Sequence, residues 1–255
     1  MIFTDTHTHL YDEQLATDEA EMIQRALDAG VTKMYMPNCD STTIAGMMKI
    51  AAAYPQHCYP MMGVHPCYIK EHYKEELAIA KEQLAQHRFY AIGEIGLDYY
   101  WDMTFKEQQI EAFNTQIDWA VEHNLPIVIH SRESLQDCID IVRSKQNGSL
   151  KGIFHCFSGN EDEAKQVVEL GFHLGIGGVV TFKNSTLPQA LAGIDLAHMV
   201  LETDAPYLAP VPYRGKRNES AYIPLVAQRL ADIKQVSIET LAEITTANAT
   251  KIFGE

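Results

Sequence analysis

The sequence lacks the features of a secreted or membrane protein. No basic segment followed by an apolar one stands at its N-terminus, and no apolar run approaches the length of a membrane span. Its five cysteines are an odd number without a CxxC pair, which argues against a disulfide framework and against a zinc–cysteine site. We therefore expect a soluble, cytoplasmic protein with reduced thiols, and nothing in the sequence indicates an obligate protein partner.

Positive charge is also scarce. Twenty Lys and Arg residues stand against 34 Asp and Glu residues, which gives a formal net charge of −14. A surface that binds nucleic acid in general is usually basic, so this balance argues against such a surface. It leaves open a local positive cleft, particularly one that contains bound metal cations.

The chain has no internal repeat, no low-complexity tract and no linker that would divide it. A length of 255 residues lies within the range in which α/β barrels form one unit, and 46% hydrophobic residues are enough for a sizeable core. We therefore predict a single domain over residues 1–255.

Short β-branched and apolar runs alternate with longer helical patterns. Strands are predicted at residues 2–7, 33–36, 59–63, 91–95, 126–130, 152–155, 173–176 and 199–202. Helices are predicted at residues 18–29, 42–54, 75–86, 105–123, 134–144, 161–169, 187–192 and 222–234. Strands that alternate with helices in this way predict an α/β fold, a TIM-like (β/α)8 barrel, with a doubly wound open sheet as the alternative. An additional C-terminal helix at 238–253 is expected to pack outside the barrel.

Two histidines lie at the end of the first predicted strand. His7 and His9 are separated by one residue, and side chains at i and i+2 of a strand point to the same side. Two neutral imidazoles projected together can bind one metal ion, although many His-X-His strings are accidents of a polar surface.

Four further residues of metal-binding type end predicted strands: Glu94, His130, His155 and Asp204. The carboxyl ends of barrel strands meet at one mouth, where barrel active sites are built. Any one of these histidines would more often be a hydrogen-bonded structural residue. All of them at the same topological position favour a metal site made of six residues: His7, His9, Glu94, His130, His155 and Asp204.

Six ligands exceed what one tetrahedral ion with an open position needs. They suit two divalent ions roughly 3.5–4 Å apart that share a carboxylate, an arrangement used to hydrolyse phosphates and amides. Glu94 is the expected bridge, with His7, His9 and Asp204 on one ion and His130 and His155 on the other. Asp204 is also the expected acceptor of the attacking water's proton, so Glu94 and Asp204 are the predicted catalytic residues.

These residues lie in motifs that resemble the TatD family of metal-dependent deoxyribonucleases, in the amidohydrolase superfamily. The resemblance covers essentially the whole chain in the segments DTHTHL, GVHP, GEIGLDYY, LPIVIHSRE, HCFSG, ETDAPYLAP and RGKRNE. It implies a TIM-like barrel, a divalent-metal centre of the six residues, and hydrolysis of DNA phosphodiesters, often from the 3′ end. The family implies activity supported by Mg, whereas four histidines favour Zn or Mn by intrinsic affinity.

Three positions depart from the family pattern. Ala205 stands where Ser is common, Ser220 where a Pro often follows the NE pair, and Cys67 where His is frequent after GVHP. Only the change at Cys67 touches the expected mouth, where it puts a possible second histidine in doubt. The six metal residues are unaffected.

Candidate contacts to DNA lie near the mouth. His65 is expected to contact the scissile phosphate, and Arg132 offers a bidentate fork for a phosphate. Tyr207 is a candidate stacking surface for a base. Three cations after the last strand form a possible phosphate clamp: Arg214, Lys216 and Arg217. Each has a structural alternative, namely a hydrogen-bonded loop histidine, a packed tyrosine or surface ion pairs.

Asp98 has two candidate roles. Its carboxylate could orient a metal-binding histidine, or it could cap the loop that follows.

Two other functions remain open. The first is an amidohydrolase acting on a small-molecule ester, amide or lactone. Many such barrels bridge their metals with a carbamylated Lys at a strand end, where this chain has Glu94. The second is a binding module without catalysis, against which the complete ligand set argues.

Overall fold

The computed structural model describes residues 1–254, and parallel strands form its centre. The strands are β1 Phe3–Asp5, β2 Val31–Pro37, β3 Cys58–Met61, β4 Ile92–Asp98, β5 Ile127–Arg132, β6 Gly152–Phe154, β7 His173–Ile176 and β8 Met199–Leu201. Each of the predicted strands is confirmed. The main difference is β4, which continues past its predicted end to Asp98.

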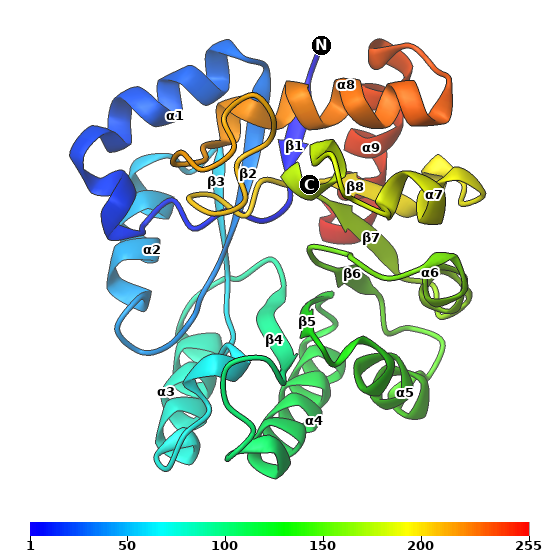
Figure 1. The fold of residues 1–255 in the computed structure, drawn as a ribbon. Helices are drawn as coiled ribbons and strands as arrows, with labels where there is room; N and C mark the ends of the chain where they lie inside the picture. The colour runs from blue at the N-terminus through cyan, green and yellow to red at the C-terminus, as the bar shows by residue number, and fades with distance from the viewer. Residues whose placement is uncertain (255) are drawn as a thin grey trace.

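Helices surround the strands, with α9 behind β8 (Figure 1). They are α1 Glu19–Asp28, α2 Ile44–Ala53, α3 Tyr73–Gln86, α4 Lys106–His123, α5 Leu135–Lys145, α6 Glu161–Glu169, α7 Leu187–Ala192, α8 Ile223–Lys234 and α9 Ile238–Phe253. All predicted helices are confirmed, with boundaries within about two residues. Among residues 1–254, no helix is long and apolar enough to cross a membrane.

The sheet closes on itself. Strands β1, β2 and β3 pair in that order, and β4 to β8 pair in a second run, all in parallel. Single bridges between Met62 and Ile92, and between Thr8 and Ala205, join the two runs at both seams. Because neighbouring strands follow one another around the ring, the fold is the predicted TIM-like barrel and not the open sheet.

The core has an inner and an outer layer. Alternate residues of a strand face opposite sides, so Val128 lies inside the barrel while Ile127 and Ile129 face the helices. Val128 joins an inner cluster that includes Ile153 and Val200. Burial on both faces explains why the strands are almost continuously apolar in the sequence.

The end of α9 covers the bottom of the barrel. The helix packs against β1 and β8, outside the strands as expected. Its last turn also places Ile252 and Phe253 in the inner cluster, and the Phe253 ring stacks on Tyr35 with centroids 3.8 Å apart. The C-terminal helix is therefore part of the barrel core and closes the end opposite the mouth.

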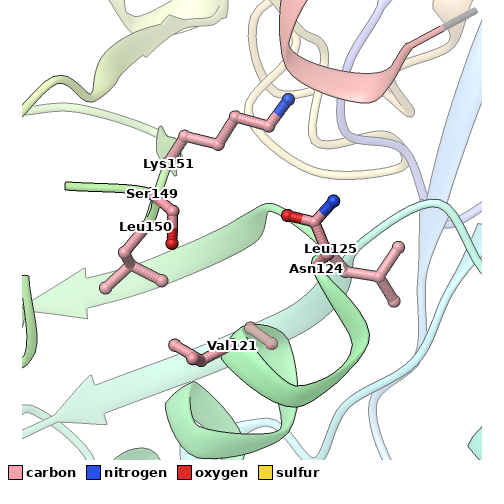
Figure 2. A pocket seen from close by; sticks show the side chains of 7 residues that line it. Val121, Asn124, Leu125, Ser149, Leu150 and Lys151 are labelled. Carbon is pink, nitrogen blue, oxygen red and sulfur yellow. The ribbon is translucent and has the colours of Figure 1, made fainter. Parts of the chain in front are cut away.

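A small hollow also lies at the bottom of the barrel. It is lined by Val121, Asn124 and Leu125 from the end of α4, and by the segment that leads into β6 (Figure 2). Its volume is about 10 Å³, which is room for about one water molecule. The bottom of the barrel therefore offers no ligand site at this place.

Replacing Phe253 should destabilise the barrel. In Phe253→Ala we expect a loss of about 3 kcal/mol in the free energy of unfolding, because a buried aromatic side chain is removed from the inner cluster. Urea denaturation of both proteins measures the difference. Ile79→Ala, at a position 37% exposed on α3, serves as the control and should change stability by less than about 1 kcal/mol. An equally small effect of Phe253→Ala would show that α9 does not close the core.

Candidate metal centre

The strand pattern brings the predicted histidines to one place. Val128 and Ile153 point into the barrel, and two residues further along the chain come His130 in β5 and His155 directly after β6. Side chains repeat with a period of two, so both imidazoles face the barrel axis at its mouth. The His155 ring stacks on that of His7, which follows β1, with the ring centroids 3.5 Å apart.

The carboxylate of Glu94 on β4 lies at the centre of the site. Its side chain is only 3% exposed, and its oxygens face ring nitrogens of five imidazoles. The nearest N–O distances are 2.8 Å to His130, 3.0 Å to His7, 3.4 Å to His65, 3.5 Å to His155 and 3.7 Å to His9. A single buried acid therefore contacts both sides of the histidine cluster, as expected of a bridging ligand.

Asp204 lies on the His7 and His9 side. Its Oδ1 is 3.4 Å from Nε2 of His9 and 3.8 Å from Nε2 of His7. Its side chain is 16% exposed, more open to solvent than that of Glu94. The backbone of Asp204 has φ 57°, in the left-handed region that non-glycine residues rarely adopt. A hydrogen bond from its N–H to the carbonyl of His7 ties this conformation to β1.

The surroundings of the two central acids favour their ionised forms. Burial favours a raised pKa for Glu94, but His65, His7 and His155 outweigh it and hold the pKa well below its usual value. The pKa of Asp204 is lowered in the same way by His9, His155 and His7 despite burial. A buried and a partly exposed carboxylate thus lie among imidazoles, and negative charge in such a place requires compensation.

This donor set fits divalent metal ions. Among the described residues, four groups place ligand atoms within 4.8 Å of one another, and three of them include Glu94 or Asp204: His7, His9 and Glu94; His7, His155 and Asp204; and His65, Glu94 and His130. The fourth consists of His155, Cys156 and Glu202. Imidazole nitrogens and carboxylate oxygens are ligands of Zn, Mn and related ions. The buried Nδ1 of His7 also has no hydrogen-bond partner among the described residues. The imidazoles and carboxylates at the barrel mouth therefore fit one or more divalent ions of this kind.

The grouping differs in one respect from the expected assignment. His155 was predicted to share an ion with His130, but it stacks on His7 and groups with Asp204. His130 groups instead with His65, whose Nε2 lies 3.3 Å from the His130 Nδ1. His65, predicted as a phosphate contact, therefore lies among the candidate ligands.

Asp98 performs both roles that its position allows. Its Oδ2 lies 2.8 Å from the His130 Nε2, so the carboxylate orients that ring. Its Oδ1 accepts hydrogen bonds from the backbone N–H groups of Tyr100 and Trp101, at 3.0 and 3.2 Å. One side chain thus connects the metal centre to the loop that follows β4.

Two orienting residues were missed in the sequence. The hydroxyl of Tyr11 lies 2.9 Å from the His9 Nδ1, and the fully buried Glu202 lies 3.0 Å from the His155 Nδ1. Burial disfavours the imidazolium of His155, but Glu202 and Glu94 outweigh it and raise its pKa to about 9. The only sequence signal is spacing, because each residue stands two positions from a predicted ligand.

Gly175 on β7 makes room for Glu202. A Cβ at this position would lie 2.2 Å from an Oε of Glu202 and 3.1 Å from the His155 Cα. The glycine is therefore needed for close approach, and it belongs to the barrel wall.

The other predicted substrate residues lie around the mouth in different environments. Tyr207 is 48% exposed, its ring centroid is 6.2 Å from that of His9, and its hydroxyl donates a hydrogen bond to Asp12. Arg132 ends β5, two residues beyond His130. Beside Arg132, a polar hollow of about 360 Å³ lies between the loops after β5 and β6.

The three cations after β8 differ in whether an acidic side chain pairs with them. Arg217 forms a bidentate ion pair with Asp18, at 2.6 and 2.8 Å. The guanidinium of Arg214 lies 4.0 Å from the centroid of the Phe182 ring, and Lys216 is exposed. Among the described residues, neither Arg214 nor Lys216 has a carboxylate partner within ion-pair distance. Two of the three charges therefore remain available to a ligand.

Comparison with known proteins places these features in a family. The family model described as "TatD related DNase" matches residues 4–254. The metal-dependent hydrolase YabD of Bacillus subtilis strain 168 is 40% identical over 254 residues, 99% of both chains. The 3′-5′ ssDNA/RNA exonuclease TatD of Pantoea ananatis is 32% identical over 98% of both chains.

A solved structure agrees with this result. The crystal structure of YJJV, a TatD homologue of Escherichia coli K12, superposes with a TM-score of 0.93 at 28% identity, over 99% of this chain and 98% of that chain. The barrel, the carboxylate-centred histidine cluster and the match across nearly the whole sequence lead to one conclusion. This chain belongs to the TatD-related DNase family and is a metal-dependent hydrolase.

Proposed function

We propose that this protein is a deoxyribonuclease that removes nucleotides from the 3′ end of single-stranded DNA. The observation that carries the proposal is the ionised Glu94 among five imidazoles, with Asp204 beside it at the barrel mouth. The substrate is inferred from the relatives named as 3′-5′ ssDNA/RNA exonucleases. Many amidohydrolases that act on esters and lactones bridge their metals with a carbamylated Lys, and this chain has Glu94 at that position. This difference also favours a nuclease over an amidohydrolase of small molecules.

The proposed centre holds two divalent ions, Mg, Mn or Zn, with Glu94 shared between them. His7, His9 and Asp204 serve one ion, and His130 serves the other together with His155 or His65. When bound, such ions offset negative charge on the phosphate and lower the pKa of a water molecule.

Asp204 is the proposed proton acceptor. Its carboxylate is ionised, is partly open to solvent, and lies against His7 and His9. An ionised carboxylate within hydrogen-bond reach of the attacking water can take its proton. Tyr11 and Asp98 fix the rings of His9 and His130, so the groups around the phosphate are held in place before substrate arrives.

Removing either central acid should abolish hydrolysis. For Glu94→Gln and Asp204→Asn we expect kcat on single-stranded DNA to fall about a thousandfold, or ~4 kcal/mol of transition-state stabilisation. Steady-state assays measure kcat, and thermal melting checks that each variant is folded. Asp140→Asn, on the exposed face of α5, is the control and should keep normal turnover. Near-normal activity of a folded Asp204→Asn protein would refute its catalytic role.

Metal content should reveal two ions. Protein dialysed against excess Mn²⁺ or Zn²⁺ is expected to bind two ions per chain, and His9→Ala and His130→Ala are each expected to bind about one. Inductively coupled plasma mass spectrometry gives the stoichiometry. His87→Ala, an exposed histidine outside the candidate groups, should still bind two. Saturation of the wild type at one ion would contradict the two-metal centre.

The loop after β8 should contribute to DNA affinity through charge. In the inactive Asp204→Asn background, replacing Arg214 and Lys216 with Gln should flatten the log–log salt dependence of binding by about 1.4, at ~0.7 per phosphate contact. Base preference should stay the same, because phosphate contacts do not read sequence.

Fluorescence anisotropy of a labelled single strand, measured over a range of salt concentrations, gives both values. Arg217→Gln is the comparison, since this residue is paired to Asp18 and should alter the slope little. If the double variant leaves slope and affinity unchanged, the loop is not part of the binding surface.

A further inference from the structure

The loop after β4 carries an exposed aromatic pair. Tyr100 is 50% exposed and Trp101 is 68% exposed, and their rings meet edge to face with centroids 4.8 Å apart. Large aromatic side chains lose favourable burial when they face water, so an exposed Trp often marks a binding surface. The other tryptophan of the chain, Trp119, is 5% exposed in α4.

A cation completes this cluster. The guanidinium of Arg132 lies 3.8 Å from the Tyr100 ring centroid and 5.1 Å from that of Trp101. No carboxylate of residues 1–254 lies within ion-pair distance of Arg132. Stacking holds the flat face of the guanidinium, while its N–H groups have no acidic partner in the fold.

The cluster is tied to the metal centre by one side chain. The Asp98 Oδ2 meets the His130 Nε2 at 2.8 Å, and the Asp98 Oδ1 accepts the N–H groups of Tyr100 and Trp101. From the other strand, Arg132 stands two residues after His130, and its carbonyl accepts the N–H of Tyr99. The aromatic pair and the cation therefore have a fixed place on the His130 side of the site.

We propose that Tyr100, Trp101 and Arg132 form a stacking platform for the bound single strand. A base of the strand stacks on the exposed face of Trp101, and the neighbouring phosphate contacts the N–H groups of Arg132. The inference rests on the proposed nuclease function and adds where the strand is held. Stacking is tolerant of sequence, because every base has a π face, and it requires an unpaired base. The platform therefore selects single strands over duplex DNA.

Tryptophan fluorescence tests the contact directly. In the metal-loaded Asp204→Asn protein, Trp119→Phe leaves Trp101 as the only tryptophan, and an oligothymidylate should quench its emission on binding. Trp101→Phe leaves only the buried Trp119, whose emission should not change, although the strand should still bind. An abasic oligonucleotide of the same length should leave the Trp101 emission unquenched. Quenching of Trp119 alone, or equal quenching by the abasic strand, would overturn the platform.

Affinity gives a second measurement. Trp101→Ala should weaken binding of the oligothymidylate about five- to a hundredfold, the loss expected for one stacked base. It should have little effect on binding of the abasic strand. Met103→Ala, at a position 49% exposed in the same loop, is the matched control and should bind normally. Arg132→Gln should flatten the salt slope by about 0.7.

The outcomes distinguish a failure of the stacking platform from a failure of the proposed nuclease function. If the wild type degrades oligothymidylate while Trp101→Ala shows unchanged affinity and KM, the platform is overturned and the nuclease stands. If the metal-loaded wild type neither binds nor degrades single strands, the nuclease proposal and the platform fail together. Preferential binding of single strands over duplex that is lost in Trp101→Ala supports both.

Discussion

The contact of one buried carboxylate with five imidazoles is the constraint on which the rest of this site depends. The pKa of Glu94 is held low inside the protein because ring nitrogens surround its carboxylate at 2.8 to 3.7 Å. These rings come from β5 and from the segments after β1, β3 and β6, so the barrel must close before the cluster exists. Orienting groups such as Asp98 then fix individual rings, which is how a metal centre is held ready for its ions.

The two ends of the barrel divide stability and chemistry between them. At the bottom, the aromatic stack of Tyr35 and Phe253 fills the interior with apolar side chains. At the mouth, the same inward-facing positions carry imidazoles and carboxylates. One strand shows the change directly, since Val128 packs in the inner core and His130 faces the site. A rigid apolar floor therefore supports a polar mouth whose groups would be costly to bury without ions.

An acidic chain can still present a positive path to nucleic acid when its cations are placed selectively. Arg217 is held by Asp18 and contributes to the fold, whereas Arg132 is stacked on an aromatic ring and has no acidic partner among the described residues. The net charge of −14 therefore describes the whole surface and not the mouth. Ion pairs within the fold decide which positive charges a substrate can reach, and they depend on which residues lie together in three dimensions.

The sequence by itself determined where the strands and helices lie along the chain and which six residues stand at strand ends, because strand periodicity and βα alternation are local patterns. It also indicated the TatD resemblance, which whole-chain comparison confirms. Tertiary structure alone decided that His155 stacks on His7, that His65 joins His130, and that Glu202 lies under His155. These contacts join strands far apart in the chain, and their geometry follows from barrel closure, which no local spacing encodes.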